Sequence, residues 1–112
     1  MSIDNVNVVD GLAADQRNGV LYLLLTDHLE WVQSENALSE QDHLLLLQEK
    51  INAYISFIEE EQFKSKYPNL ELQLAIIEIH FQYNITENCD RFLQAVQSQI
   101  EQYGIKIETH IG

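Results

Sequence analysis

The apolar and polar residues at the start of the chain alternate and then give way to an apolar run. Residues 5–9 alternate, which predicts a short strand. Asn18-Gly19 is a strong signal for a hairpin turn, and residues 20–27 follow it as the second strand of the hairpin. Both alternate sets of side chains in this second strand are apolar. We therefore expect it to be buried on both faces, or to meet a partner with one of them.

The middle of the chain carries the clearest helical pattern. Apolar residues recur at spacings of three and four within residues 40–62, namely Leu44, Leu47, Ile51, Tyr54, Ile55 and Ile58. Ser39 followed by Asp42 resembles a capping box at the start of this segment. The spacing predicts a long amphipathic helix. Tyr67-Pro68 should close it, because the residue before a proline is disfavoured in a helix.

Residues 70–84 predict a strand whose apolar side chains change parity partway along. Leu70, Leu72 and Leu74 fall on one parity, and Ile77, Ile79, Phe81 and Tyr83 fall on the other. Either a bulge shifts the register near Ala75 and Ile76, or the first residues belong to the connection. The polar side chains Glu78, His80 and Gln82 should face away from the helices.

The last part of the chain predicts a helix and a strand. Thr86 fits the N-cap of a helix over residues 87–103, which Gly104 ends, and residues 105–111 alternate as a final strand. The expected buried stripe of this helix is Phe92, Val96, Ile100 and Tyr103. The order ββαβαβ predicts one α+β domain over residues 1–112, a two-layer sandwich with two helices on one face of a four-stranded mixed sheet.

Charge is the strongest feature of the composition. The 112 residues include 18 acidic and 6 basic ones, for a formal net charge of −12, and residues 1–62 hold 12 of the acids with only Arg17 and Lys50. Between these two bases lie six acids, Asp27, Glu30, Glu35, Glu40, Asp42 and Glu49. Such a surface repels phosphate backbones and anionic lipid, so we expect neither nucleic acid nor a membrane as a partner.

The remaining composition favours the cytoplasm. Cys89 is the only cysteine, so an intrachain disulfide and a cysteine metal cage are excluded. The chain begins without the pattern of a secretory signal. Its longest apolar runs are far shorter than the roughly 18 residues that cross a bilayer.

The segment TDHLEW, residues 26–31, is the first candidate site. It places Asp27, His28 and Glu30 ahead of the only tryptophan, Trp31. If the strand continues, His28 and Glu30 share one face and Asp27 takes the other, so a metal ion would need a further ligand such as Asp42 or His43. The favoured interpretation is that the strand ends here, Leu29 and Trp31 cap the core, and the acids are solvated.

A second candidate comprises the outward residues of two strands, Glu78, His80, Glu108 and His110. Two histidines and two carboxylates suit zinc or another divalent ion if the strands are neighbours. A solvated face of charged residues has the same pattern and is the favoured interpretation, and pairing of Lys106 with Glu108 would make a poor metal cage. We therefore predict no metal and no cofactor.

The sequence gives no positive support for an enzyme. Cys89 lies near the start of the second predicted helix, where the helix dipole should lower the pKa of its thiol, but no base accompanies it. A glycine-rich phosphate loop, a GxSxG elbow and an HExxH motif are all absent. The expected class is a protein without catalytic activity.

Several segments together resemble a known family. The segments are DHLEW at residues 27–31, HLLLLQEKINAYISFIE at residues 43–59, Tyr67-Pro68 and Gly104-Ile105. With them the chain resembles a family of small bacterial proteins catalogued only as a domain of unknown function. The resemblance covers most of the chain and implies no activity.

The main hypothesis from the sequence is an acidic binding protein of the bacterial immunity or antitoxin type. It would block a basic toxin, such as a nuclease, through charge complementarity. The expected partner-binding residues are Asp27, Glu30, Trp31, Glu35, Glu40 and Asp42. One alternative is a homodimeric structural or accessory protein that pairs through the second apolar face of residues 20–27. A weaker alternative is a metal-dependent enzyme that uses His28 with Glu30, or His80 with His110.

Overall fold

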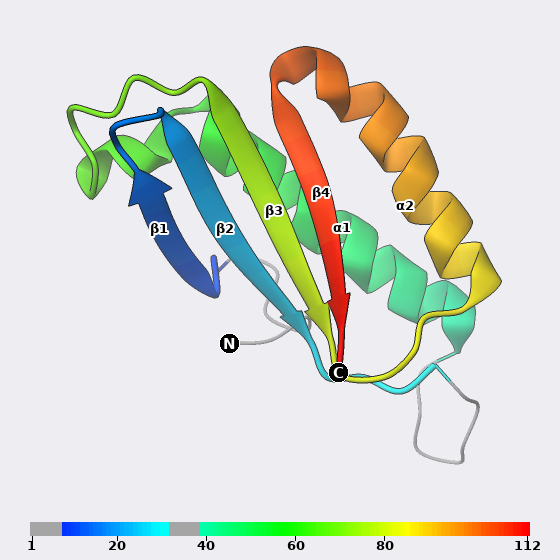
Figure 1. The fold of residues 1–112 in the computed structure, drawn as a ribbon. Helices are drawn as coiled ribbons and strands as arrows, with labels where there is room; N and C mark the ends of the chain where they lie inside the picture. The colour runs from blue at the N-terminus through cyan, green and yellow to red at the C-terminus, as the bar shows by residue number, and fades with distance from the viewer. Residues whose placement is uncertain (1–7, 32–38) are drawn as a thin grey trace.

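The computed structural model describes residues 8–31 and 39–112 and confirms the α+β fold (Figure 1). The elements in chain order are β1 (Gly11–Asp15), β2 (Val20–Asp27), α1 (Glu40–Glu59), the 3₁₀ turn η1 (Gln62–Ser65), β3 (Leu74–Phe81), α2 (Glu87–Ile100), the 3₁₀ turn η2 (Glu101–Tyr103) and β4 (Ile105–Ile111). None of the helices within the described ranges is long and apolar enough to cross a membrane.

The four strands form one mixed sheet in the order β1-β2-β3-β4. β1 runs antiparallel to β2, whereas β3 is parallel to both β2 and β4. In Figure 1, α1 crosses behind the sheet and α2 runs alongside β4. Residues of both helices join the inward side chains of the strands in one hydrophobic core. Each parallel pair of strands is thus joined through a helix, as the ββαβαβ order requires.

The two faces of β2 differ in burial. Leu21, Leu23 and Leu25 point toward the helices and are fully buried, whereas the side chains between them are only partly buried. The run is apolar on both faces because its outward residues lie in the middle of the open sheet face, between β1 and β3. β3 repeats the inward pattern with Ala75, Ile77, Ile79 and Phe81, which are also buried.

The first strand lies later in the chain than the alternation of residues 5–9 predicts. Residues 5–7 lie outside the described ranges, and the strand that pairs with β2 is β1, with Asp15 opposite Val20. Tight hairpins need pairing close to the turn, and a strand at residues 5–9 would leave a loop of ten residues. The turn itself is as predicted. Gly19 has φ 69°, and a Cβ there would lie 2.4 Å from the carbonyl oxygen of Glu71.

The helix starts match the sequence prediction better than the helix ends. The Ser39 side chain accepts a hydrogen bond from the backbone N–H of Asp42, and Thr86 caps α2 in the same way. α1 ends at Glu59 rather than at Tyr67-Pro68, because Glu61 adopts a left-handed conformation with φ 57° and a 3₁₀ turn follows. The chain has therefore left the helix before the proline can act.

The start of β3 and the end of the second helical segment are both defined by the backbone. β3 begins at Leu74, so residues 70–73 belong to the connection and the change of parity needs no bulge. Gly104 ends the second helical segment with φ 74°. The predicted burial of Tyr103 is wrong, since its side chain is 62% exposed. The helix tightens into η2 at Glu101–Tyr103, which turns Tyr103 away from the buried stripe.

A buried polar cluster fixes the edge of the sheet where β1 begins. The Lys50 ammonium lies 2.7 Å from one oxygen of the Asp10 carboxylate, and both side chains are almost fully buried. The other Asp10 oxygen accepts a hydrogen bond from the backbone N–H of Thr26. The Tyr54 hydroxyl donates to the Leu24 carbonyl at 2.6 Å, and burial raises the pKa of this hydroxyl. Asp10, just before β1, thus satisfies a backbone donor of β2 that lies past the first paired residue of β1.

Candidate functional site

The topology brings several polar groups to one end of the molecule. Because β2, β3 and β4 are parallel, their carboxyl ends lie at the same edge of the sheet, and α1 and α2 begin near it (Figure 1). Ligands of open α/β sheets bind outside the carboxyl ends of the strands. A functional site is therefore expected at this edge of the sheet.

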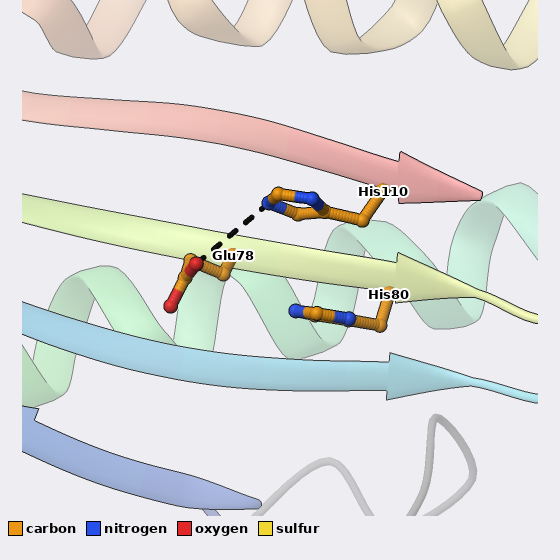
Figure 2. A group of neighbouring side chains, drawn as sticks. All are labelled: Glu78, His80 and His110. Atoms are coloured by element: carbon orange, nitrogen blue, oxygen red, sulfur yellow. Dashed lines mark ion pairs between the residues drawn. The ribbon is translucent and has the colours of Figure 1, made fainter. Parts of the chain in front are cut away.

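Two histidines and a glutamate meet on the outward face of β3 and β4 (Figure 2). His80 is the register partner of His110, and their rings stack with centroids 4.6 Å apart. The Nε2 atom of His110 lies 3.7 Å from a carboxylate oxygen of Glu78. One ligand atom from each of these three residues lies within 4.8 Å of the other two. The structure thus brings together the outward residues that the sequence places on two strands.

The fourth member of the predicted group is partly engaged elsewhere. Glu108 is the register partner of Glu78 and lies 3.8 Å from His110. Its other oxygen lies 3.5 Å from the Lys106 ammonium, as the sequence suggested. The cation competes for this carboxylate, so the set available to a ligand is Glu78, His80 and His110.

An open hollow of about 390 Å³ lies at the same edge. Its lining includes His80 and His110, and also His28, which follows the end of β2. The three histidine side chains are exposed. A small ligand or a side chain of another protein could reach the imidazoles from solvent.

The segment TDHLEW folds differently from the favoured interpretation. Trp31 caps the core as expected, but the Asp27 carboxylate is not solvated and is only 1% exposed. It lies 2.6 Å from the Nε2 atom of His43, whose ring stacks on Trp31 with centroids 3.5 Å apart. The reason is that His43 sits on the buried stripe of α1 and brings a polar partner into the core.

This buried cluster is closed to a partner. Asp27 also accepts a hydrogen bond from the backbone N–H of Leu29. The Nδ1 atom of His43 and the Nε1 atom of Trp31 are buried without a hydrogen-bond partner among the residues that the structure describes. Asp27 and Trp31 therefore do not contribute to the surface, although both belong to the predicted partner-binding set.

The remaining acids of that set lie at or near the surface. Glu30 and Asp42 are exposed, Glu40 is partly buried, and Glu35 lies outside the described ranges. The Asn88 side chain donates a hydrogen bond of 2.8 Å to Glu40, which joins the first turns of α1 and α2. Hydrogen bonds from the Thr86 hydroxyl and from Asn88 lower the pKa of Glu40, so this carboxylate stays charged at neutral pH.

Acids of the second helix extend this surface. Glu87 and Asp90 are exposed in the first turn of α2, and Asn88 between them is bonded to Glu40 of α1. Carboxylates are favoured at helix N-termini by the helix dipole, which explains why both helices begin with them. We call Glu30, Glu40, Asp42, Glu87 and Asp90 the acidic end of the molecule.

The expected effect of the helix dipole on Cys89 is wrong. Burial raises the pKa of the thiol to about 12, and the negative charges of Asp27, Asp90 and Glu40 act in the same direction. The side chain is fully buried. The thiol is therefore neutral at physiological pH and inaccessible to a substrate.

Sequence reasoning missed the buried polar pairs. His43 and Lys50 fall on the same face of α1 as Leu47 and Tyr54, with spacings of four, three and four. Polar residues on an apolar stripe are the signal that could have found these pairs, because such residues need buried partners. The sequence does not show that Asp27 and Asp10 would be those partners.

Comparison with known proteins identifies a family but no activity. A family model described as a family of unknown function (DUF6572) matches residues 1–112. Neither the curated proteins nor the solved structures contain a match. The resemblance to an uncharacterised family is thus confirmed over the full length of the chain.

Proposed function

The chain belongs to DUF6572, a family of unknown function, and we propose that it is a non-enzymatic acidic binding protein. The class that fits best is a bacterial inhibitor of the immunity or antitoxin type, which covers a basic toxin such as a nuclease. The observation that carries the proposal is the acidic end, where the first turns of α1 and α2 both carry carboxylates and are joined by the hydrogen bond from Asn88 to Glu40.

The packing supports such a surface in two ways. Trp31 stacks on His43 in the first turn of α1, which holds the neighbouring Glu30 beside that helix. The hydrogen bond from Asn88 to Glu40 fixes the two helix starts against each other. A preorganised set of charges gives faster and more selective encounter with an oppositely charged partner.

Nearby bases offset little of this charge. Lys50 is buried against Asp10, so it adds no positive charge to the surface. Arg91 donates a hydrogen bond to Glu87 at 2.7 Å, and this exposed pair leaves Asp90 and the acids of α1 unaffected. The acidic end therefore keeps its negative character.

Charge reversal at the acidic end tests the proposal. The partner is first captured by chemical crosslinking in the cells that produce the protein, and is then purified. We expect the triple variant Glu30→Lys, Glu40→Lys and Asp42→Lys to bind this partner at least roughly tenfold more weakly in calorimetric titration, because charge pairs at interfaces couple strongly. Circular dichroism and thermal unfolding check that the variant remains folded.

A matched variant controls for the change in net charge. Glu59, Glu60 and Glu71 are exposed, and they lie at the end of α1 and in the connection before β3, away from the acidic end. Their replacement by lysine changes the net charge by the same amount. This control should bind as the unchanged protein does. Equal affinity of all three proteins, or an equal loss in both variants, would contradict the proposal.

The outward face of β2 favours one alternative, a homodimer. Val20, Tyr22 and Leu24 are only partly buried there, and Ile76 of β3 lies beside Tyr22 in the same sheet face. A second copy of the chain could cover these side chains. Light scattering at increasing protein concentration decides this alternative. A dimer mass supports it, and a monomer mass at the highest concentration removes it.

A further inference from the structure

We propose that Glu78, His80 and His110 bind a divalent transition-metal ion of the zinc class on the outward face of β3 and β4. The ligands would be one carboxylate oxygen and two imidazole nitrogens. This inference uses neither the proposed partner nor the acidic end, so either proposal can fail without the other.

The backbone already places the three side chains together. Glu78 and His80 are two residues apart on β3 and share its outward face, and His110 is the register partner of His80 on β4. β3 lies between β2 and β4, so hydrogen bonds on both sides hold its backbone. Sites built on strands are positioned more accurately than sites built on loops.

The separations suit a metal ion after small side-chain rotations. The three ligand atoms lie within 4.8 Å of one another, and the pair from Glu78 and His110 is 3.7 Å apart. Ligand atoms of a tetrahedral zinc ion lie about 3.4 Å apart, given zinc–ligand distances of about 2.1 Å. The two imidazoles are exposed and Glu78 is partly buried, so the side chains have room to close by this amount.

The register differs from that of an ordinary solvated face. Glu78 is paired with Glu108 and His80 with His110, so like groups lie directly opposite each other. Carboxylates that lie close together repel each other, and a nearby cation reduces this repulsion. The Lys106 ammonium partly neutralises the Glu108 carboxylate. A metal ion bound between the two imidazoles and Glu78 would neutralise the Glu78 carboxylate.

The donor set selects the class of ion. Imidazole nitrogen suits zinc, copper, iron and nickel, whereas magnesium and calcium prefer oxygen ligands alone. Three protein ligands leave one position of a tetrahedral ion open, and His80 and His110 line a hollow that is open to solvent. Water or a group from another molecule would occupy that position.

Zinc titration of the full-length, untagged protein tests the inference. After treatment with a chelator and its removal, we expect isothermal titration to show one equivalent of Zn²⁺ bound. His80→Ala and His110→Ala should each weaken binding by at least roughly tenfold, and Glu78→Gln should weaken it in the same direction. His28→Ala is the matched control. Its imidazole is exposed and lines the same hollow but is outside the cluster, so binding should be unchanged.

A measurement on the unchanged protein guards against variants that fail to fold. Imidazole signals of His80 and His110 should shift on addition of Zn²⁺ in nuclear magnetic resonance spectra, whereas those of His28 should stay in place. The inference is overturned if the unchanged protein binds no zinc at metal concentrations well above its own. It is also overturned if binding depends on His28 and is indifferent to His80 and His110.

Discussion

Lys50 is a cation held wholly inside the protein. Its ammonium pairs with Asp10 at 2.7 Å, and the same carboxylate accepts from the backbone N–H and the hydroxyl of Thr26. Desolvating two charges is costly, and the pair is tolerated only because hydrogen bonds satisfy the remaining oxygen. Loss of one partner leaves the other charge buried and uncompensated.

We therefore expect Lys50→Met to be strongly destabilising. The loss should be about 3–5 kcal/mol of unfolding free energy, the usual cost of breaking a buried ion pair. Urea unfolding followed by circular dichroism measures it. Lys64→Met is the control, because Lys64 pairs with Glu61 at an exposed position, and such a pair contributes at most about 1 kcal/mol. Similar losses in the two variants would contradict the structural role of Lys50.

The residues of the candidate site were predictable to different degrees. Alternation along a strand fixes a side chain's face, and this placed Glu78, His80 and His110 outward correctly. Burial at the end of a strand depends on which element packs there. The sequence pattern therefore predicts a solvated Asp27. Its burial against His43 depends on the packing of α1 on the sheet, which the sequence pattern does not show.

Most elements follow directly from local pattern. β2 and α2 begin where the turn and cap residues predict, because Gly19 and Thr86 act through local geometry. β1 does not follow, since four of the five residues of Gly11–Asp15, namely one glycine, two alanines and one aspartate, favour strands weakly. Pairing with β2 determines this strand, and pairing partners are not encoded in the alternation of a single segment.

At the start of α2, burial affects the pKa of the Cys89 thiol more strongly than the helix dipole does. Cys89 has a pKa of about 12 against an ordinary value of 9.0. A raised pKa in the folded state means that the thiol contributes stability below pH 9, and that this contribution is lost as the pH rises through the range from 9.0 to about 12. In Cys89→Ala, the unfolding free energy measured by urea unfolding should therefore fall less steeply between pH 9.0 and about 12 than in the unchanged protein.

The same burial predicts an unreactive thiol. A disulfide reagent such as Ellman's reagent should not modify Cys89 in the folded protein at pH 8, and it should modify one thiol per chain after addition of urea. The absorbance of the released thiolate measures the reaction. Rapid modification of the folded protein would show that Cys89 is accessible or ionised.

At the scale of the whole molecule, one topology gathers the polar features. Parallel β2, β3 and β4 end at one edge, and the helices between them begin there. The fold class was predictable because the order of strands and helices limits the possible layers. The sequence predicted Glu30, Glu40 and Asp42 of the acidic end but not the contribution of α2, because Glu40 and Asn88 are distant in sequence and meet only when the starts of α1 and α2 lie side by side.

The rate of association with the captured partner tests the central claim most directly. Electrostatic complementarity acts mainly on the association rate and weakens with salt. At low salt, the variant with Glu30, Glu40 and Asp42 changed to lysine should associate at least roughly tenfold more slowly than the variant with Glu59, Glu60 and Glu71 changed. The difference should shrink as salt is added. Equal association rates for these two variants, which carry the same net charge, would contradict the assignment of partner binding to the acidic end.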